Sequence, residues 1–452
     1  MCSILGAFNS QISYNEFEKL NQSLVHRGPD NSTIKQYLFC DKQFILAHNR
    51  LSIQDLDSRA NQPMENERFI IVFNGEIYNH FALRKLLNYQ DFKTTSDTET
   101  LLFCFLEWGI EKTLNSINGM FAIGLMDKQE QEFYLIRDRE GIKPLYYAKK
   151  DGSFYFASQP KGLPEYLREK KSDKALIQFM SLGYIPYDGS YFSDINKIPP
   201  AHYLVFDGKQ TNMHKYWNPS KKPLSISFEE AIQTTEELLR SSIKYRLLAD
   251  VDVGSFLSGG IDSSLVSAIM SQESNAQIKT FSIGFEDKEY DESNYASHIA
   301  KYLGTIHYEY ICTPSDVLSL LDHIDNFFDE PFGDPSSLPM MLLSKITKKQ
   351  VSVALSGDGG DELFLGYDRY FTTNKYFHLF NKIPQSIRNI LSYLAKHSSI
   401  DKLEKVSYPM RHLTKDNLYS VISTSTKPWE LTKMFNQDFI MDNFKQIPSY
   451  LE

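Results

Sequence analysis

Cysteine is scarce in this sequence, and long apolar runs are missing. The four cysteines are Cys2, Cys40, Cys104 and Cys312. Because none of them forms a C-x-x-C pair, we expect neither a cysteine zinc motif nor a disulfide framework, and a reducing cytoplasm is the expected location. The longest apolar stretches, such as 69–73 and 351–355, are far shorter than the ~20 residues of a membrane helix. The amino terminus lacks the basic and apolar regions of a signal peptide, so we expect no membrane partner.

Positive charge is also in short supply. The 48 basic and 57 acidic residues give a formal net charge of −9, opposite in sign to a nucleic-acid-binding surface. We therefore expect no nucleic-acid partner. Hydrophobic residues make up 42% of the chain and aromatic residues 13%, which is enough to form apolar cores and excludes a disordered chain. At roughly 150 residues per domain, the length of 452 residues indicates two or three domains.

The first 210 residues are dominated by short β-type runs that are bounded by Gly, Asn and Asp turn signals. These runs span 43–47, 69–73, 120–126, 132–137, 145–148 and 153–157. Helical periodicity is found over 14–25, 80–87 and 97–108. The mixture predicts an α+β sandwich over residues 1–210, followed by a polar linker with Pro and Lys residues over 211–227.

From residue 228 the chain alternates between helices and strands. The predicted strands span 253–257, 280–285, 307–312 and 351–355. The predicted helices span 228–248, 263–271, 293–303, 315–328 and 338–348. This alternation predicts an α/β domain over 228–452, with a parallel sheet covered by helices on both faces. Beyond residue 370 the chain is expected to be helical.

Cys2 follows the initiator Met, and a side chain this small normally allows that Met to be removed. The free α-amino group of Cys2, with an ordinary pKa of ~7.7–8.0, could then act as the general base for its own thiol. Taken alone, a cysteine at position two is more often just a small residue near the start of a chain. Whether Cys2 is catalytic therefore depends on which other catalytic and binding groups the sequence contains.

Three further segments supply the groups that amide hydrolysis needs. Arg50 ends a predicted strand, where its guanidinium suits a bidentate grip on a carboxylate. Asn74 and Gly75 stand where another strand stops, and they offer a side-chain amide and a backbone N–H as the two donors of an oxyanion hole. Asp97 follows the helix cap Ser96 and could hold a ligand ammonium group.

Together with three more motifs, these residues resemble the class II glutamine amidotransferase domain over about the first 200 residues. The motifs are HRGPD at 26–30, NGMFA at 118–122 and RDREGIKPLYY at 137–147. The resemblance implies an N-terminal-nucleophile hydrolase sandwich of αββα type. It also implies that Cys2 is the nucleophile and that Asn74 and Gly75 form the oxyanion hole. The glutamine-binding residues that it implies are Arg50, Ile53, Asn74, Gly75, Glu76 and Asp97.

A second group of motifs surrounds a Gly-Gly turn. Residues 256–264 read FLSGGIDSS, which would direct backbone N–H groups and a helix N-terminus at an anion. The segment lacks the Lys of a Walker loop, and a Gly-Gly turn alone could be a plain tight turn. Residues 356–362 read SGDGGDE and follow another strand, at the sheet edge where ligands gather. Asp262 and Asp361 could therefore face one Mg²⁺–pyrophosphate unit.

The FLSGGIDSS string resembles the PP-loop of ATP pyrophosphatases, an adenine nucleotide α-hydrolase-like fold. The order of amidotransferase and then PP-loop domain resembles glutamine-dependent asparagine synthases, which segments 280–285, 290–292 and 329–337 also match. The resemblance implies magnesium binding by Asp262 and Asp361, and a catalytic acid at Asp358 that supports the activated intermediate. It implies ATP binding by Leu257, Ser258, Gly259, Gly260, Asp262, Ser263, Ile283, Ser356 and Gly357.

The activity implied by this resemblance is ATP-dependent asparagine synthesis from the small-molecule substrates glutamine, aspartate and ATP. Ammonia released from glutamine at Cys2 would attack a β-aspartyl-adenylate, giving asparagine, glutamate, AMP and pyrophosphate. A related enzyme that amidates a sugar acid or a peptide would keep every motif, so the acceptor stays open at this point. The resemblance also favours a homodimer.

In the family, a further segment carrying a Lys of the synthetase site follows the stretch that resembles 448–451. The present sequence ends at Glu452. We therefore expect glutaminase chemistry to be kept and amide synthesis to be slowed in this chain. The alternatives are a protein with glutaminase activity only and a non-catalytic protein that binds nucleotide and glutamine.

Overall fold

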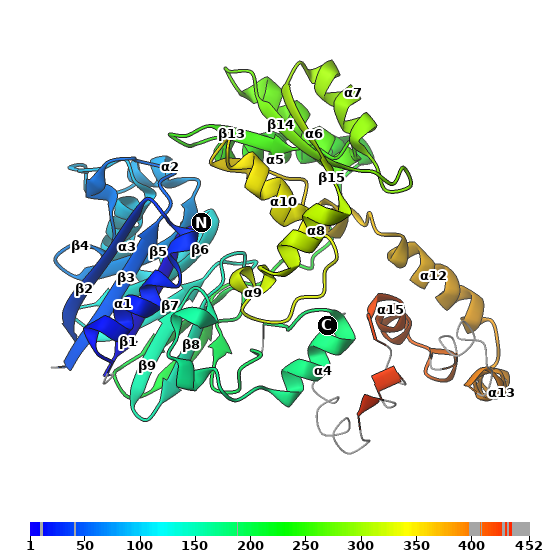
Figure 1. The fold of residues 1–452 in the computed structure, drawn as a ribbon, viewed down its shortest axis with the longest axis horizontal. Helices are drawn as coiled ribbons and strands as arrows, with labels where there is room; N and C mark the ends of the chain where they lie inside the picture. Colours follow the sequence, from blue (N-terminus) through cyan, green and yellow to red (C-terminus); the bar gives the residue numbers. More distant parts are fainter. Residues whose placement is uncertain are drawn as a thin grey trace. The chain divides into compact units, whose positions relative to one another are not determined.

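Figure 1 shows the computed structural model of the chain, which describes residues 1–9, 12–39, 42–187, 189–396, 407, 409–426, 430–431 and 434–435. Cys40 and the stretch 448–452 lie outside the described residues. The chain divides into two units. The first comprises Met1–Lys171, Tyr187–Asp329 and Ser336–Ser356, and the second comprises Ser172–Pro186, Glu330–Pro335 and Gly357–Glu452.

The amino-terminal part of the first unit contains two antiparallel sheets, each six-stranded over the described residues. The sheet ordered β10-β8-β9-β1-β3-β2 consists of β1 (Ser3–Phe8), β2 (Asn31–Phe39), β3 (Lys42–Arg50), β8 (Tyr146–Lys150), β9 (Ser153–Ala157) and β10 (Asn196–Lys197). The sheet ordered β12-β11-β7-β6-β5-β4 consists of β4 (Met64–Glu65), β5 (Phe69–Ile77), β6 (Gly119–Asp127), β7 (Glu132–Arg137), β11 (His202–Phe206) and β12 (Thr211–Lys215). The helices of this part are α1 (Tyr14–Gln22), α2 (His80–Arg84) and α3 (Asp97–Ser116), with short turns η1 (Val25–Arg27), η2 (Ser58–Ala60), η3 (Pro160–Gly162) and η4 (Glu165–Leu167).

Buried clusters show how these elements are layered. Phe8 of β1 and Phe133 of β7 lie in the core between the sheets, with ring centroids 4.5 Å apart. Phe105 of α3 packs with Ile71 on the outer face of one sheet, and Phe17 of α1 packs on the outer face of the other. Helices thus cover both outer faces, which confirms the predicted αββα sandwich.

All six strands predicted for this part are present, and 132–137 and 153–157 match to the residue. Strand β1 was not predicted because it is buried on both faces and shows no alternation. Residues 211–215, which we assigned to the linker, form β12 instead. The reason is that Gly208, at φ 89°, turns the chain back into a hairpin with β11.

The rest of the first unit is an α/β fold. Its elements are α5 (Phe228–Arg246), β13 (Val253–Phe256), α6 (Ile261–Glu273), β14 (Lys279–Phe285), α7 (Ser293–Leu303), β15 (Ile306–Cys312), α8 (Pro314–Leu321), α9 (Ile324–Phe327), α10 (Ser337–Thr347) and β16 (Val353–Leu355). The strands form a parallel sheet in the order β15-β14-β13-β16. Ile243 of α5 and Ile269 of α6 pack with Val253 in one cluster, while Leu343 of α10 packs against Phe281 in another. The predicted parallel sheet with helices on both faces is confirmed.

The second unit is helical over its described residues. It contains α4 (Asp173–Leu182), α11 (Gly360–Phe364), α12 (Asp368–Asn381), α13 (Gln385–Lys396) and α15 (Lys415–Ser423). The rings of Tyr370 and Tyr419 stack with centroids 5.8 Å apart and so join α12 to α15. No described helix combines the length and the apolar character needed to cross a bilayer.

Candidate active site

Strand pairing brings the predicted nucleophile to the predicted arginine. β1 pairs with β3 so that Ser3 lies opposite Asn49, which sets Cys2 beside the end of β3. The Leu51 N–H donates to Cys2 Sγ at 3.3 Å, and Arg27 Nε donates to the Cys2 carbonyl oxygen at 3.1 Å. The HRGPD motif therefore has a structural role, because its arginine holds the backbone of Cys2.

The surroundings of Cys2 suit an amine that acts as a base. Burial raises the pKa of the Cys2 thiol, and burial lowers the pKa of the amino terminus to about 5. An amine that is neutral at pH 7 can accept the thiol proton as the sulfur attacks. In the structure this amine is the α-amino group of Met1. Hydrolysis of the Met1–Cys2 peptide bond would remove it and free the α-amino group of Cys2 in its place.

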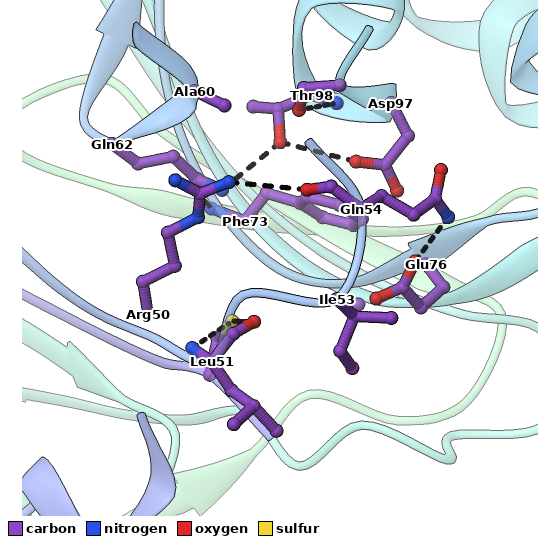
Figure 2. Close-up of a pocket in the computed structure, with 13 residues that line it drawn as sticks. Arg50, Leu51, Ile53, Gln54, Ala60, Gln62, Phe73, Glu76, Asp97 and Thr98 are labelled. Atoms are coloured by element: carbon purple, nitrogen blue, oxygen red, sulfur yellow. Dashed lines mark hydrogen bonds between the residues drawn. The ribbon is translucent and has the colours of Figure 1, made fainter. Parts of the chain in front are cut away.

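A cavity opens beside Cys2 (Figure 2). It collects side chains from the start of β1, the segment after β3, the end of β5 and the start of α3. The lining residues are Cys2, Arg50, Leu51, Ile53, Gln54, Ala60, Gln62, Phe73, Gly75, Glu76, Ser96, Asp97 and Thr98. The structure thus brings together every predicted residue of this site except Asn74, which is next to the lining in sequence.

Asn74 and Gly75 lie within β5 and not, as was predicted, where it stops, because the pairing of β5 with β6 continues to Ile77. Asn74 is buried, and its Nδ2 has no hydrogen-bond partner among the described residues. A Cβ added at Gly75 would overlap the carbonyl oxygen of Met120 on β6, so only glycine fits there. A buried donor left unpaired costs about 1–3 kcal/mol, and a substrate oxyanion would remove that cost.

Arg50 differs from its expected state. One terminal nitrogen donates to Asp57 O at 3.0 Å and Asn61 Oδ1 at 2.8 Å. The other donates to Gln54 O at 3.3 Å and to Asp55 O. These four contacts use every hydrogen on both terminal nitrogens. A carboxylate bound bidentately through these nitrogens must therefore replace some of the contacts with segment 54–61.

Glu76 and Asp97 form the acidic wall of the cavity. Gln54 Nε2 donates to Glu76 Oε2 at 2.5 Å, as Figure 2 shows, and the Ile77 N–H donates to Asp97 Oδ2 at 2.9 Å. Burial, followed by the charge of Asp97, raises the pKa of Glu76. Burial also raises the pKa of Asp97 against the lowering effect of the Ile77 N–H. Two such acids resist full ionisation until a cation such as a ligand ammonium joins them.

Replacing Glu76 by Gln is expected to remove part of the pH dependence of stability. Because the pKa of Glu76 is raised on folding, the folded protein binds this proton more tightly than the unfolded chain. The free energy of unfolding should therefore fall as the pH rises above 4.5, the ordinary pKa of the group. The loss should reach at least ~1 kcal/mol in the parent, the equivalent of one pKa unit, and should be smaller in Glu76→Gln.

Urea unfolding of both proteins from about pH 5 to about pH 8 measures this difference. Glu18→Gln, which neutralises an exposed carboxylate on α1, is the control and should follow the parent. Parallel curves for the parent and Glu76→Gln would contradict the raised pKa.

Some residues of the site escaped the sequence reasoning. Gln54 had no motif around it, and Lys143 belonged to a quoted motif without an assigned role. Lys143 is buried, which lowers its pKa, and its ammonium interacts electrostatically with Glu76 and Cys2. Asp138 positions it, since one carboxylate oxygen accepts the Lys143 N–H at 2.9 Å. The roles of Gln54 and Lys143 could not be predicted from local pattern, because each interacts with residues in distant segments of the chain.

The Gly-Gly turn has the geometry of an anion cradle. Gly259 has φ 90°, and a Cβ there would lie 2.6 Å from Tyr295 Cβ, so glycine is required. Ser263 Oγ accepts the Ser258 N–H at 3.2 Å, and Ser258 Oγ accepts the Gly260 N–H at 3.2 Å. No side chain caps α6, which begins at Ile261, two residues earlier than predicted. Its first N–H groups remain available to an anion.

The other predicted ATP-site residues of the first unit lie next to this turn in the sequence or on neighbouring strands of the sheet. β13 lies beside β16 with Ser255 opposite Leu355, so the turn and Ser356 leave the sheet at the same edge. Leu257 is buried against α7, and Ile283 packs on the cluster formed with α8 and α10. These two positions are thus anchored in the core beneath the edge.

The acidic turn belongs to the second unit from Gly357 onward. Asp361 lies in the first turn of α11, and Gly359 precedes it at φ 91°. The pairing of Asp262 with Asp361 and the role of Asp358 stay predictions. No group of three or more His, Cys, Asp or Glu side chains in the described part of the chain is arranged to hold a metal ion.

The described architecture combines an N-terminal-nucleophile hydrolase sandwich with a PP-loop-type α/β fold. A family model described as a glutamine amidotransferase domain matches residues 1–217, and one described as asparagine synthase matches residues 234–439. The chain is 34% identical over 420 residues to a Methanocaldococcus jannaschii protein whose name assigns it to the glutamine-hydrolysing asparagine synthetases, covering 87% of this chain and 81% of that protein. The chain belongs to the glutamine-hydrolysing asparagine synthetase family.

Two more comparisons define the extent of the likeness. Asparagine synthetase (glutamine-hydrolysing) 1 of Bacillus subtilis is 35% identical over 408 residues, and the match covers 87% of this chain but 63% of that protein. The chain therefore spans less than two thirds of the length of this relative. Among solved structures, glutamine phosphoribosylpyrophosphate amidotransferase from B. subtilis has a TM-score of 0.37 and 13% identity, covering 78% of this chain and 90% of that chain.

Proposed function

We propose that this chain makes asparagine by ATP-driven amide synthesis with ammonia taken from glutamine. The observation that carries the proposal is the convergence, on one cavity, of a half-buried thiol, a buried arginine, a glycine of β5 and two acids. The cradle of the Gly-Gly turn and the names of the two relatives support the synthetase part.

In the glutaminase step, Cys2 Sγ attacks the side-chain carbonyl carbon of glutamine and its proton passes to the α-amine. The amine then protonates the departing ammonia, which leaves a thioester on Sγ. The Asn74 amide and the Gly75 N–H stabilise the oxyanion as it forms. Water hydrolyses the thioester, releasing glutamate and restoring the thiol.

Glutamine is held for this step by charges at its other end. Glu76 and Asp97 bind the α-ammonium group, whose positive charge offsets the burial and the repulsion by Asp97 that raise the pKa of Glu76. Arg50 binds the α-carboxylate after exchanging contacts with segment 54–61, and Ile53 completes the wall.

In the synthetase step, the β-carboxylate of aspartate attacks the α-phosphorus of ATP and pyrophosphate leaves. Ammonia then attacks the carbonyl of the β-aspartyl-adenylate, giving asparagine and AMP. The Gly259 N–H and the first N–H groups of α6 bind the phosphates. The N–H groups of Ser258 and Gly260 join them after giving up their serine hydroxyl acceptors, and Asp358 supports the intermediate. Leu257, Ser263, Ile283, Ser356 and Gly357 complete the ATP-binding set.

Asp262 and Asp361 would hold magnesium at this site. Their carboxylate oxygens are the hard ligands that magnesium prefers, and the side chain of Asp262 makes no hydrogen bond or ion pair with another described residue. Bound magnesium would offset the charge of the leaving pyrophosphate.

The low cysteine content supports a cytoplasmic location. The family resemblance favours a homodimer, which light scattering would test.

AMP formation with aspartate, compared with a panel of sugar acids and peptides, tests the proposal. With ATP and either glutamine or ammonia, we expect aspartate to be the preferred acceptor. Preference for another carboxylate would instead indicate a related amidotransferase. Glutamine hydrolysis with no AMP from any acceptor would indicate a protein with glutaminase activity only.

A further inference from the structure

The end of α5 contacts the segment that lines the glutamine cavity. The Asp250 N–H donates to the Ile53 carbonyl oxygen at 2.9 Å, and the Asp55 N–H donates to Asp250 Oδ2 at 2.7 Å. Asp250 lies just after α5 and three residues before β13, which runs into the Gly-Gly turn. The residue is thus continuous with the PP-loop fold while it bonds to the amidotransferase fold, and both lie in the first unit.

Asp55 is the centre of this contact. Only 8% of its surface is exposed, and its backbone adopts the left-handed conformation with φ 51°, which is uncommon for a side chain other than glycine. Its carboxylate is already engaged, because Oδ2 accepts the Thr95 N–H at 2.6 Å and Oδ1 accepts the Asp57 N–H at 3.0 Å. The Asp55 N–H therefore depends on an acceptor from elsewhere in the chain, and Asp250 supplies it.

The segment held in this way shapes the cavity. Arg50 donates to the carbonyl oxygens of Gln54 and Asp55, while Gln54 donates to Glu76 at 2.5 Å. A shift of Asp55 would therefore move two of the groups assigned to glutamine binding.

A second contact comes from the same end of α5. The guanidinium carbon of Arg246 lies 4.6 Å from the centroid of the Tyr78 ring, and Arg246 donates to Ser242 O at 3.0 Å. Tyr78 directly follows β5, which carries Asn74, Gly75 and Glu76. The end of α5 and the loop after it thus contact two of the backbone segments that line the cavity, or their direct continuation.

We infer that Asp250 is a positioning residue for the glutamine site, contributed by the synthetase part of the chain. This inference rests on the proposed function, since it assigns the cavity to glutamine. The Asp250 carboxylate fixes the Asp55 N–H, and Asp55 in turn fixes the segment that engages Arg50 and Glu76. Asp250 itself is exposed, so its substitution should leave the fold intact.

Asp250→Ala tests the inference in the full chain. We expect the KM for glutamine to rise about 3- to 10-fold, as the loss of one hydrogen bond predicts, with kcat for glutamine hydrolysis nearly unchanged. Ammonia-dependent AMP formation should stay at the parent level. Asp250→Asn keeps an acceptor oxygen and should restore most of the affinity.

Asp252→Asn is the matched control. Asp252 is on the same loop and forms an ion pair with Lys279 at 2.7 Å, with 70% of its side chain exposed. Its substitution removes one negative charge two residues away without touching segment 53–57, so the glutamine KM should not change. An unchanged KM in Asp250→Ala, or an equal loss of glutamine- and ammonia-dependent activities, would overturn the inference.

Amide hydrogen exchange separates this inference from the proposed function, because it needs no substrate. The Asp55 amide should exchange faster in Asp250→Ala than in the parent or in Asp252→Asn. Unchanged exchange would overturn the positioning role, even if glutamine is hydrolysed normally. Faster exchange in a protein that hydrolyses no glutamine would support the contact and count against the proposed function alone.

Discussion

Replacing Cys2 by alanine is expected to abolish glutamine hydrolysis while ammonia-dependent AMP formation continues. The thiol is the only group of the chain that forms a covalent bond to glutamine in the proposal, and the loss of a nucleophile typically lowers kcat by ~10⁴-fold or more. The synthetase site does not use Cys2, so free ammonia should still reach the activated carboxylate. Glutamate release and AMP release, measured on the same preparation, report the two steps.

Cys104→Ala is the matched control for this prediction. Cys104 is a free, buried thiol on α3, in the layer between that helix and its sheet, and it does not line the cavity. Its removal should affect stability more than glutamine hydrolysis. If Cys2→Ala lost both activities to the same extent, the proposal of two separate sites would be wrong.

Asp262→Asn should have the converse effect, removing AMP formation and leaving glutaminase activity measurable. The substitution removes one charge from the proposed magnesium site, where developing charge on the pyrophosphate must be met by a fixed cation. The loss of one such preorganised interaction typically costs ~10²–10³ in rate. Asp361→Asn should behave in the same way if both acids serve one ion.

Pyrophosphate release with aspartate and ATP, followed beside glutamate release, measures this prediction. Asp252→Asn is again a suitable control, because it lies before β13, at the opposite end of the strand from the Gly-Gly turn. Normal pyrophosphate release from Asp262→Asn would show that its assignment as a magnesium ligand is wrong. A loss in Asp262→Asn but not in Asp361→Asn would contradict the pairing of the two acids.

The sequence by itself predicted both fold classes and most of the first site. Turn signals bounded the strands 132–137 and 153–157 correctly, because Gly, Asn and Asp report local backbone conformation. Motif order was enough to group Cys2, Arg50 and Asp97, which the structure then placed in one cavity. These features depend on local sequence or on the order of motifs, so they could be predicted without a three-dimensional structure.

Other features were decided only by the tertiary structure. β1 is buried on both faces and has no alternating pattern, and β12 was hidden in a polar segment that pairs only because β11 lies beside it. The hydrogen bonds that occupy Arg50, and the bond from Asp55 to Asp250 across 195 positions, follow from how distant segments pack. Local pattern cannot reveal such contacts, because each donor and acceptor gains its partner only when the sheets and helices have assembled.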